Sequence, residues 1–148
     1  MVWIMRVGRQ RDFRWEVRMV GLGAVIGLAA GMLMLAGVFD YIRRDTIRGK
    51  LGRNQAIGIR TKPTMASERA WQAGHRAAAP WLWWAARSGY VLAPASVLLG
   101  VVLAALDTGG VLGVIIGFAC FAAVLAFVLV GMRAANRAAA NVVEEHDH

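Results

Sequence analysis

Three long stretches of the sequence contain no charged residue, and they limit the possible folds more than any other feature. They cover residues 19–39, 88–106 and 108–132, and a charged residue stands at each boundary. A helix that crosses the hydrocarbon core of a bilayer needs about 20 predominantly apolar residues. Because lipid offers no hydrogen-bond partners, a spanning segment must satisfy its own backbone groups, which favours a helix. We therefore predict an all-α integral membrane protein with three transmembrane helices at these positions.

The composition supports a membrane protein and argues against a soluble domain. Apolar residues make up 58% of the chain and the mean hydropathy is +0.51, whereas soluble domains contain about 45–50% apolar residues. A single cysteine rules out a disulfide framework within the chain. The net charge is +8, and the charges lie between the apolar stretches. This arrangement favours the lipid bilayer surface as a partner and gives no reason to expect nucleic acid binding.

The Lys and Arg residues are distributed unevenly among the segments outside the three stretches, which predicts the orientation in the membrane. They are an N-terminal segment (1–18), a loop (40–87) and a polar C-terminal tail (133–148). The loop carries ten Lys and Arg residues, the tail two and the N-terminal segment five. The positive-inside rule therefore predicts that the loop and the tail face the cytoplasm. The first apolar stretch is longer than the 7–15 residues typical of a signal peptide, so we expect it to span.

Small residues recur at every fourth position within the apolar stretches. Such ridges let helices approach closely in lipid. They are compatible with packing inside one three-helix bundle or with an interface to a second copy or another membrane protein. The ridges consist of Gly23, Gly27 and Gly31, of Ser96, Gly100 and Ala104, and of Gly109, Gly113 and Gly117.

The basic loop contains a segment that predicts a short amphipathic helix at the membrane interface, over about residues 65–79. Thr64 is a favourable N-cap, and a carboxylate at Glu68 suits the first turn. Pro80 predicts that the helix ends near residue 79. The spacing of Glu68, Trp71 and His75 places them on one helical face.

Aromatic residues follow this segment, at the start of the second stretch. Amphipathic rings prefer the headgroup level of a membrane, so we interpret them as interfacial anchors. Arg87, beside them, can reach lipid phosphates from the same zone. The aromatic residues are Trp81, Trp83, Trp84 and Tyr90.

Three interpretations of the loop remain open. It can be a structural latch held by Arg60 and Glu68 or an equivalent pair, a surface that recognises a partner, or a catalytic or metal site. One His and one Glu are too few ligands for a catalytic zinc ion, which needs three protein ligands. Phosphate-binding and dinucleotide-binding fingerprints are missing from the sequence. We therefore expect no enzymatic activity, no cofactor and no metal. The lack of charges inside the apolar stretches also argues against an ion-coupled transporter.

The same loop segment resembles the signature of the SdpI family, the immunity proteins for a sporulation-delaying peptide toxin and their relatives. The chain resembles a short form with one motif domain, although Lys62 and Pro63 depart from the usual pattern. The resemblance implies a bacterial cytoplasmic-membrane protein without enzymatic activity, in which the motif loop is the functional centre. In the type member, immunity is joined to signalling through a repressor held at the membrane. The matching positions are Asn54, Gly58, Ile59, Arg60, Thr61, Thr64, Glu68, Trp71, His75 and Arg76.

Two functions follow as hypotheses. The first is binding of, or immunity to, a membrane-active peptide toxin, through contact with the helices or the loop. The second is a non-catalytic accessory subunit of a larger membrane complex, which the small size and the small-residue ridges favour. The expected partners are the bilayer, a peptide toxin, and a membrane protein or a second copy of the chain.

Overall fold

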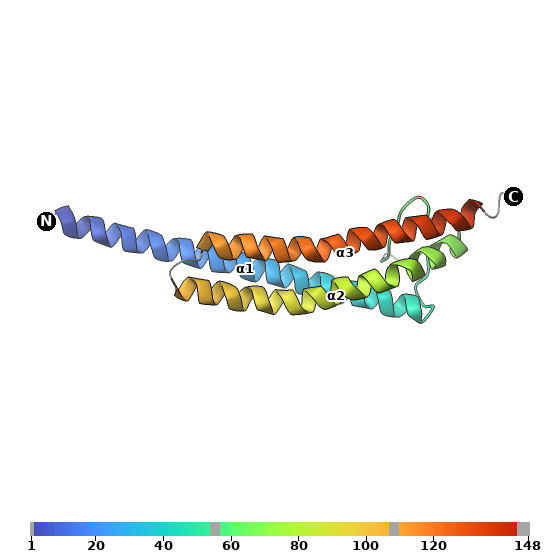
Figure 1. The fold of residues 1–148 in the computed structure, drawn as a ribbon, viewed down its shortest axis with the longest axis horizontal. Helices are drawn as coiled ribbons and strands as arrows, with labels where there is room; N and C mark the ends of the chain where they lie inside the picture. The colour runs from blue at the N-terminus through green and yellow to red at the C-terminus, as the bar shows by residue number, and fades with distance from the viewer. Residues whose placement is uncertain (1, 54–56, 107–109, 145–148) are drawn as a thin grey trace.

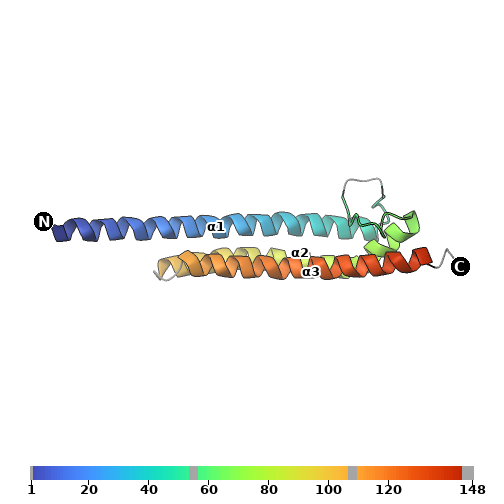
Figure 2. The same ribbon diagram turned by 90° about the horizontal axis from the view of Figure 1, so that it is seen from above.

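The computed structural model describes residues 2–53, 57–106 and 110–144, with the backbone alone for residues 2–14. The chain forms three long helices, α1 (Val2–Ile47), α2 (Glu68–Ala105) and α3 (Gly110–Glu144). They lie side by side in an elongated up-down-up bundle, in which α2 runs against the direction of α1 and α3 (Figure 1). The N-terminal part of α1 projects beyond the ends of the other two helices (Figures 1 and 2).

Each helix is long and apolar enough to cross a membrane. The candidate spans lie within Trp15–Ile47, Glu68–Ala105 and Gly110–Glu144. This confirms the predicted fold class, an all-α protein with three helices that can span a bilayer. The helices also extend past the charge-free stretches. The length of a charge-free stretch is set by the thickness of the hydrocarbon core, whereas the helix itself can continue into the headgroup region and the water beyond.

The separate short helix predicted over residues 65–79 is not confirmed. The helix begins at Glu68, and its N-cap is Ser67, whose hydroxyl accepts a hydrogen bond from the Ala70 N–H at 3.0 Å. The predicted N-cap, Thr64, therefore lies before the helix. The predicted end near residue 79 is also wrong, because α2 continues through Pro80 as far as Ala105. An interior proline removes one backbone hydrogen bond, and long membrane-protein helices tolerate this loss.

The third helix also continues further than predicted. Residues 133–144, assigned from the sequence to a polar tail, form the last turns of α3, and residues 145–148 lie outside the described part of the chain. Ala135 and Ala139 are fully buried in this region. Alanine has the highest helix propensity, and its small side chain allows a neighbouring helix to approach.

Close packing of the bundle depends on glycines at the helix crossings. A Cβ atom added to Gly89 would lie 2.9 Å from the Cβ of Ala36, across the α1–α2 contact. A Cβ atom added to Gly131 would lie 3.0 Å from the Cβ of Trp81, across the α2–α3 contact. Both distances are shorter than ordinary carbon–carbon contacts. These two positions therefore set how closely α1 and α3 approach α2.

The predicted small-residue ridges divide into an inner and an outer set. Gly100 and Gly113 meet inside the bundle, where a Cβ atom on Gly113 would lie 3.7 Å from the Gly100 Cα. Gly23 and Gly27 on α1 are exposed, and no described atom lies within 4 Å of a Cβ built on either. Gly109 lies outside the described residues. Internal packing thus accounts for the ridge contacts of α2 and α3, but not for the start of the α1 ridge.

Candidate functional site: a loop docked on the bundle end

The loop between α1 and α2 folds back over one end of the bundle, close to the last turns of α3 (Figures 1 and 2). A loop carries many backbone N–H and C=O groups, and these need partners wherever they are removed from water. In this loop the partners of the backbone groups are the Trp71 and His75 side chains of α2 and side chains of the loop itself, whereas α3 contributes Asn136, which bonds to a loop hydroxyl. The site is therefore built by two helices that present buried polar groups to a folded connector.

Trp71 provides the main contact surface for the loop. Its side chain is fully buried, and its indole Nε1–H donates a hydrogen bond to the Leu51 carbonyl at 2.8 Å. The ring packs in an apolar cluster that includes Ile42 from α1 and Leu82 from α2. Burying an aromatic ring stabilises a contact strongly, and the indole N–H then requires an acceptor. Trp71 thus ties the first part of the loop to the bundle.

His75 lies one turn further along α2 and holds the second part of the loop. It is 1% exposed, and its Nε2 accepts a hydrogen bond from the Ile59 N–H at 2.8 Å. Because Nε2 is an acceptor, the ring proton lies on Nδ1, which donates to the Trp71 carbonyl at 2.9 Å. The imidazole is therefore neutral when the loop is docked.

The position of His75 also affects its titration. It precedes the charge-free segment of α2, which starts at residue 88, and so lies outside the apolar crossing. Burial lowers the pKa of His75 below its ordinary value, and the hydrogen bond to the Trp71 carbonyl opposes this effect in part. Protonation of Nε2 would also place a second donor against the Ile59 N–H.

Gly58 lies directly on the Trp71 and His75 rings. Its φ angle is 138°, a region that residues with a side chain rarely adopt. A Cβ atom at this position would lie 2.6 Å from the Trp71 Cη2 and 2.9 Å from the His75 Nε2. Both the backbone angle and the space therefore require glycine where the loop crosses the two rings.

Two threonines form the hydrogen-bonded centre of the loop. The buried Thr64 hydroxyl donates to the Ile59 carbonyl at 2.6 Å and accepts from the Thr61 N–H at 2.9 Å. The Thr61 hydroxyl donates to the Oδ1 of Asn136 on α3 at 2.5 Å. Through these bonds the loop is closed on itself and attached to α3.

Three further motif residues lie at the surface. Arg60, Glu68 and Arg76 are exposed, and Asn54 lies outside the described residues. Arg60 donates to the Arg53 carbonyl at 3.3 Å, while the Glu68 carboxylate accepts a hydrogen bond from Gln72 at 3.4 Å. The pairing of Arg60 with Glu68 stays a prediction.

Glu68, Trp71 and His75 all lie on α2 at the spacing predicted for one face, but they differ in burial. Trp71 and His75 are buried and their ring centroids lie 4.0 Å apart, whereas Glu68 is exposed in the first turn of α2. The helix has only just begun at Glu68, so the loop does not cover this side chain as it covers the next two turns.

Sequence reasoning missed several partners of the loop. Leu51 takes part through its backbone carbonyl, which carries no residue-specific signal. Arg53 donates to the Met65 carbonyl at 3.2 Å and so links the two halves of the loop. Asn136 was assigned to the tail, although a polar amide among alanines in a continuing helix is a usable signal for a buried partner.

The buried polar side chains of the site are engaged in holding the loop. Within the described residues, no three His, Cys, Asp or Glu side chains are grouped as metal ligands. His75 directs both ring nitrogens to backbone groups. The arrangement suits a rigid loop that presents exposed charges near the end of the bundle.

Comparison with known protein families matches residues 50–132 to the SdpI/YfhL protein family. The match covers more than half of the chain, including nearly all of the docked loop, α2 and most of α3. The chain belongs to the SdpI/YfhL family. Searches of curated proteins and of solved structures gave no match. The family segment starts after α1, so the part of this SdpI/YfhL protein that carries the family pattern is the loop with the two helices that follow it.

Proposed function

We propose that this SdpI/YfhL family protein binds a membrane-active peptide and makes the cell immune to it, without catalysing a reaction. The observation that supports this proposal is the division of the motif into two sets. Gly58, Thr64, Trp71 and His75 hold the loop in one conformation, whereas Arg60 and other charged members are exposed. Binding costs less when the recognising surface is already ordered, so a docked loop favours affinity.

The proposal includes a place and an orientation. The protein would span the bacterial cytoplasmic membrane, with the motif loop and the C-terminal end of α3 on the cytoplasmic side, as the excess of Arg and Lys in the loop predicts. A signalling role belongs to the same proposal, because a loop occupied by peptide presents a different surface to a second protein. Labelling of single engineered cysteines in the loop, in a Cys120→Ser background, tests the orientation.

Protection from killing tests the proposed function directly. We expect that expression in a sensitive bacterium raises survival against a cationic or hydrophobic membrane-active peptide. Arg60→Ala and Arg76→Ala should each abolish protection at unchanged protein level. Arg69→Ala is the matched control, because Arg69 is exposed on the same helix as Arg76 but lies outside the motif. Equal survival with and without the protein, across a panel of such peptides, would reject the proposal.

An accessory subunit of a larger membrane complex is the second candidate, and the exposed α1 ridge favours it. Gly23 and Gly27 present a flat surface that nothing in the described chain covers, and such surfaces pack against other helices in lipid. Purification in mild detergent followed by mass spectrometry distinguishes the candidates. A large partner in fixed ratio, lost on Gly27→Leu, supports the accessory role, whereas a monomer or a homo-oligomer weakens it.

A further inference from the structure

A charged cavity lies between α1 and α2, separate from the docked loop. It has a volume of about 370 Å³. It is formed where both helices leave their charge-free segments, so its wall combines side chains from the end of one segment and the start of another. The lining residues used below are Asp40, Arg43, Arg44, Trp83, Arg87 and Tyr90.

The lining carries an excess of positive charge. Asp40 is its one carboxylate, and this group pairs with Arg44 at 2.6 Å and with Arg43 at 3.8 Å. The third guanidinium, that of Arg87, lies 5.0 Å from the centroid of the Trp83 ring. Three arginines therefore face one acid, and among the described residues no carboxylate is paired with Arg87.

The depth of the cavity matches the headgroup region of a bilayer. Asp40 directly follows the charge-free stretch of α1, and Arg87 directly precedes that of α2. Tyr90 and Val91, which also line the cavity, are 42% and 65% exposed on the apolar side. Tyrosine and tryptophan favour the level of the headgroups, where an apolar surface meets a polar one. The cavity thus opens along the bundle surface where phosphates and the first acyl carbons of lipids reside.

We propose that this cavity binds the phosphate headgroup of an anionic phospholipid. The planar guanidinium groups of Arg43 and Arg87 form paired hydrogen bonds to phosphate oxygens from opposite walls. Asp40 holds Arg44 in place and limits the excess charge, while the acyl chains extend over Val91 along the exposed apolar face of α2. Basic pockets between transmembrane helices are a recurrent form of anionic lipid site. A second cavity of about 400 Å³ shares Arg43 and Trp83 and leaves room for a larger headgroup.

Native mass spectrometry of the full chain tests this site. The protein is released from detergent micelles that contain equal amounts of phosphatidylglycerol and phosphatidylcholine. We expect adducts of phosphatidylglycerol to persist at activation energies that remove phosphatidylcholine. Arg87→Gln and Arg43→Gln should each reduce phosphatidylglycerol binding about fivefold, since one arginine near an anionic surface contributes on that order.

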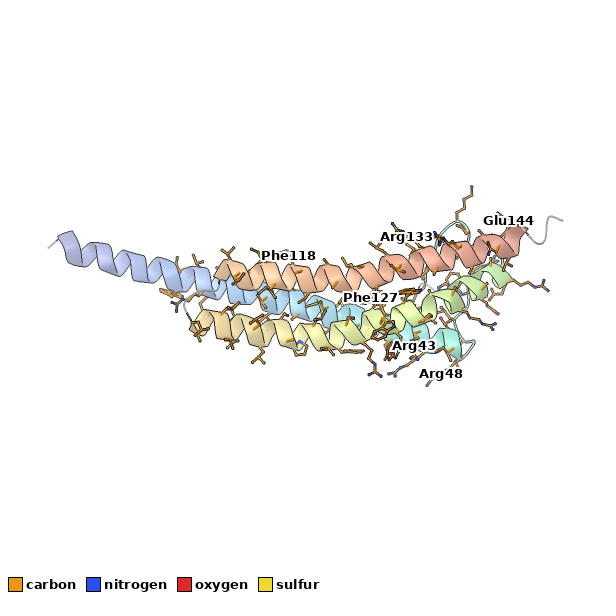
Figure 3. The ribbon with its side chains drawn as sticks, in the orientation of Figure 1. Arg43, Arg48, Phe118, Phe127, Arg133 and Glu144 are labelled. Atoms are coloured by element: carbon orange, nitrogen blue, oxygen red, sulfur yellow. The ribbon has the colours of Figure 1, made fainter. Side chains whose placement is uncertain are left out.

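Arg133→Gln is the matched control. Arg133 directly follows the third charge-free stretch, and Arg87 directly precedes the second in a helix of opposite direction, but Arg133 does not line the cavity. In Figure 3 Arg133 lies along the upper edge of the bundle and Arg43 along the lower edge. The substitution removes the same charge at the same depth, so it should leave the adducts unchanged. An equal loss for all three variants would show general surface attraction and overturn the proposal.

A further measurement distinguishes a lipid phosphate from free inorganic phosphate as the ligand. Excess inorganic phosphate is added to the wild-type protein, and the same adducts are counted. If a lipid is the ligand, phosphatidylglycerol is retained, because the acyl chains add contacts that free phosphate lacks. Complete displacement by inorganic phosphate, or equal retention of both lipids, would overturn the lipid site. Unchanged melting temperatures of the variants confirm that they fold, and either arginine variant alone suffices for the test.

Discussion

At the scale of single residues, Gly58 is the position where the docked loop tolerates least change. Gly58→Ala would place a methyl group 2.6 Å from a Trp71 ring carbon at a φ angle of 138°. Overpacking and backbone strain together should cost about 2 kcal/mol or more. We expect hydrogen exchange of the Ile59 amide to accelerate about thirtyfold, as that free energy implies.

Gly52→Ala provides the control for this prediction, because it lies in the same loop and a Cβ atom there would meet nothing within 4 Å among the described atoms. Its exchange pattern should match that of the wild type. If Gly58→Ala leaves the Ile59 amide as protected as before, the loop does not dock on Trp71 and His75 as described.

A second prediction at this scale concerns pH. The lowered pKa of docked His75 means that the released loop binds the proton more readily, so acid favours release. The contribution of docking is complete above the ordinary histidine pKa of about 6.5 and decreases as the pH falls from there towards the lower docked pKa. Hydrogen exchange of the loop amides, corrected for the intrinsic effect of pH, should therefore accelerate on acidification through this window.

His75→Gln separates titration from packing. A glutamine carbonyl can accept the Ile59 N–H but does not titrate, so the pH dependence should disappear even if the loop is less stable overall. A variant with the same pH profile as the wild type would assign the effect to another group.

At the scale of elements, the main result is that one helix combines two tasks. The charge-free stretch predicted the apolar part of α2, and the capping residues and Pro80 predicted a separate helix before it. Their fusion through Pro80 was not predicted, because proline usually marks a helix boundary in soluble proteins. The contact between Thr61 and Asn136 was also out of reach, since these residues lie 75 positions apart and no periodicity links them.

The link between loop and α3 can be measured by a double-mutant cycle. Thr61→Val and Asn136→Ala remove the two partners of one part-buried hydrogen bond. We expect a coupling free energy of about 1 kcal/mol when unfolding of the four proteins is compared in mild detergent. The control cycle pairs Thr61→Val with Asn141→Ala, an exposed amide further along α3, and should give a coupling near zero. Equal coupling in both cycles would contradict a direct bond.

At the scale of the whole molecule, the sequence was sufficient for the architecture but not for the site. The length and hydropathy of the apolar stretches predict three spanning helices. Every crossing needs about 20 apolar residues, and its backbone must form its hydrogen bonds within the helix. The family motif identified the loop segment. Within this motif Trp71 and His75 are buried while Arg60 is exposed. The sequence alone does not predict this difference in burial, because it depends on where the loop crosses α2.

The uninterrupted course of α2 has a mechanical consequence. From Trp71 to Ala105 the helix extends about 50 Å, at about 1.5 Å per residue. The ring that holds the loop and the far turn of α2 thus belong to one helix, with Pro80 and Pro94 between them. A ligand that displaces the loop therefore acts on the same helix whose far part is apolar enough to cross a bilayer.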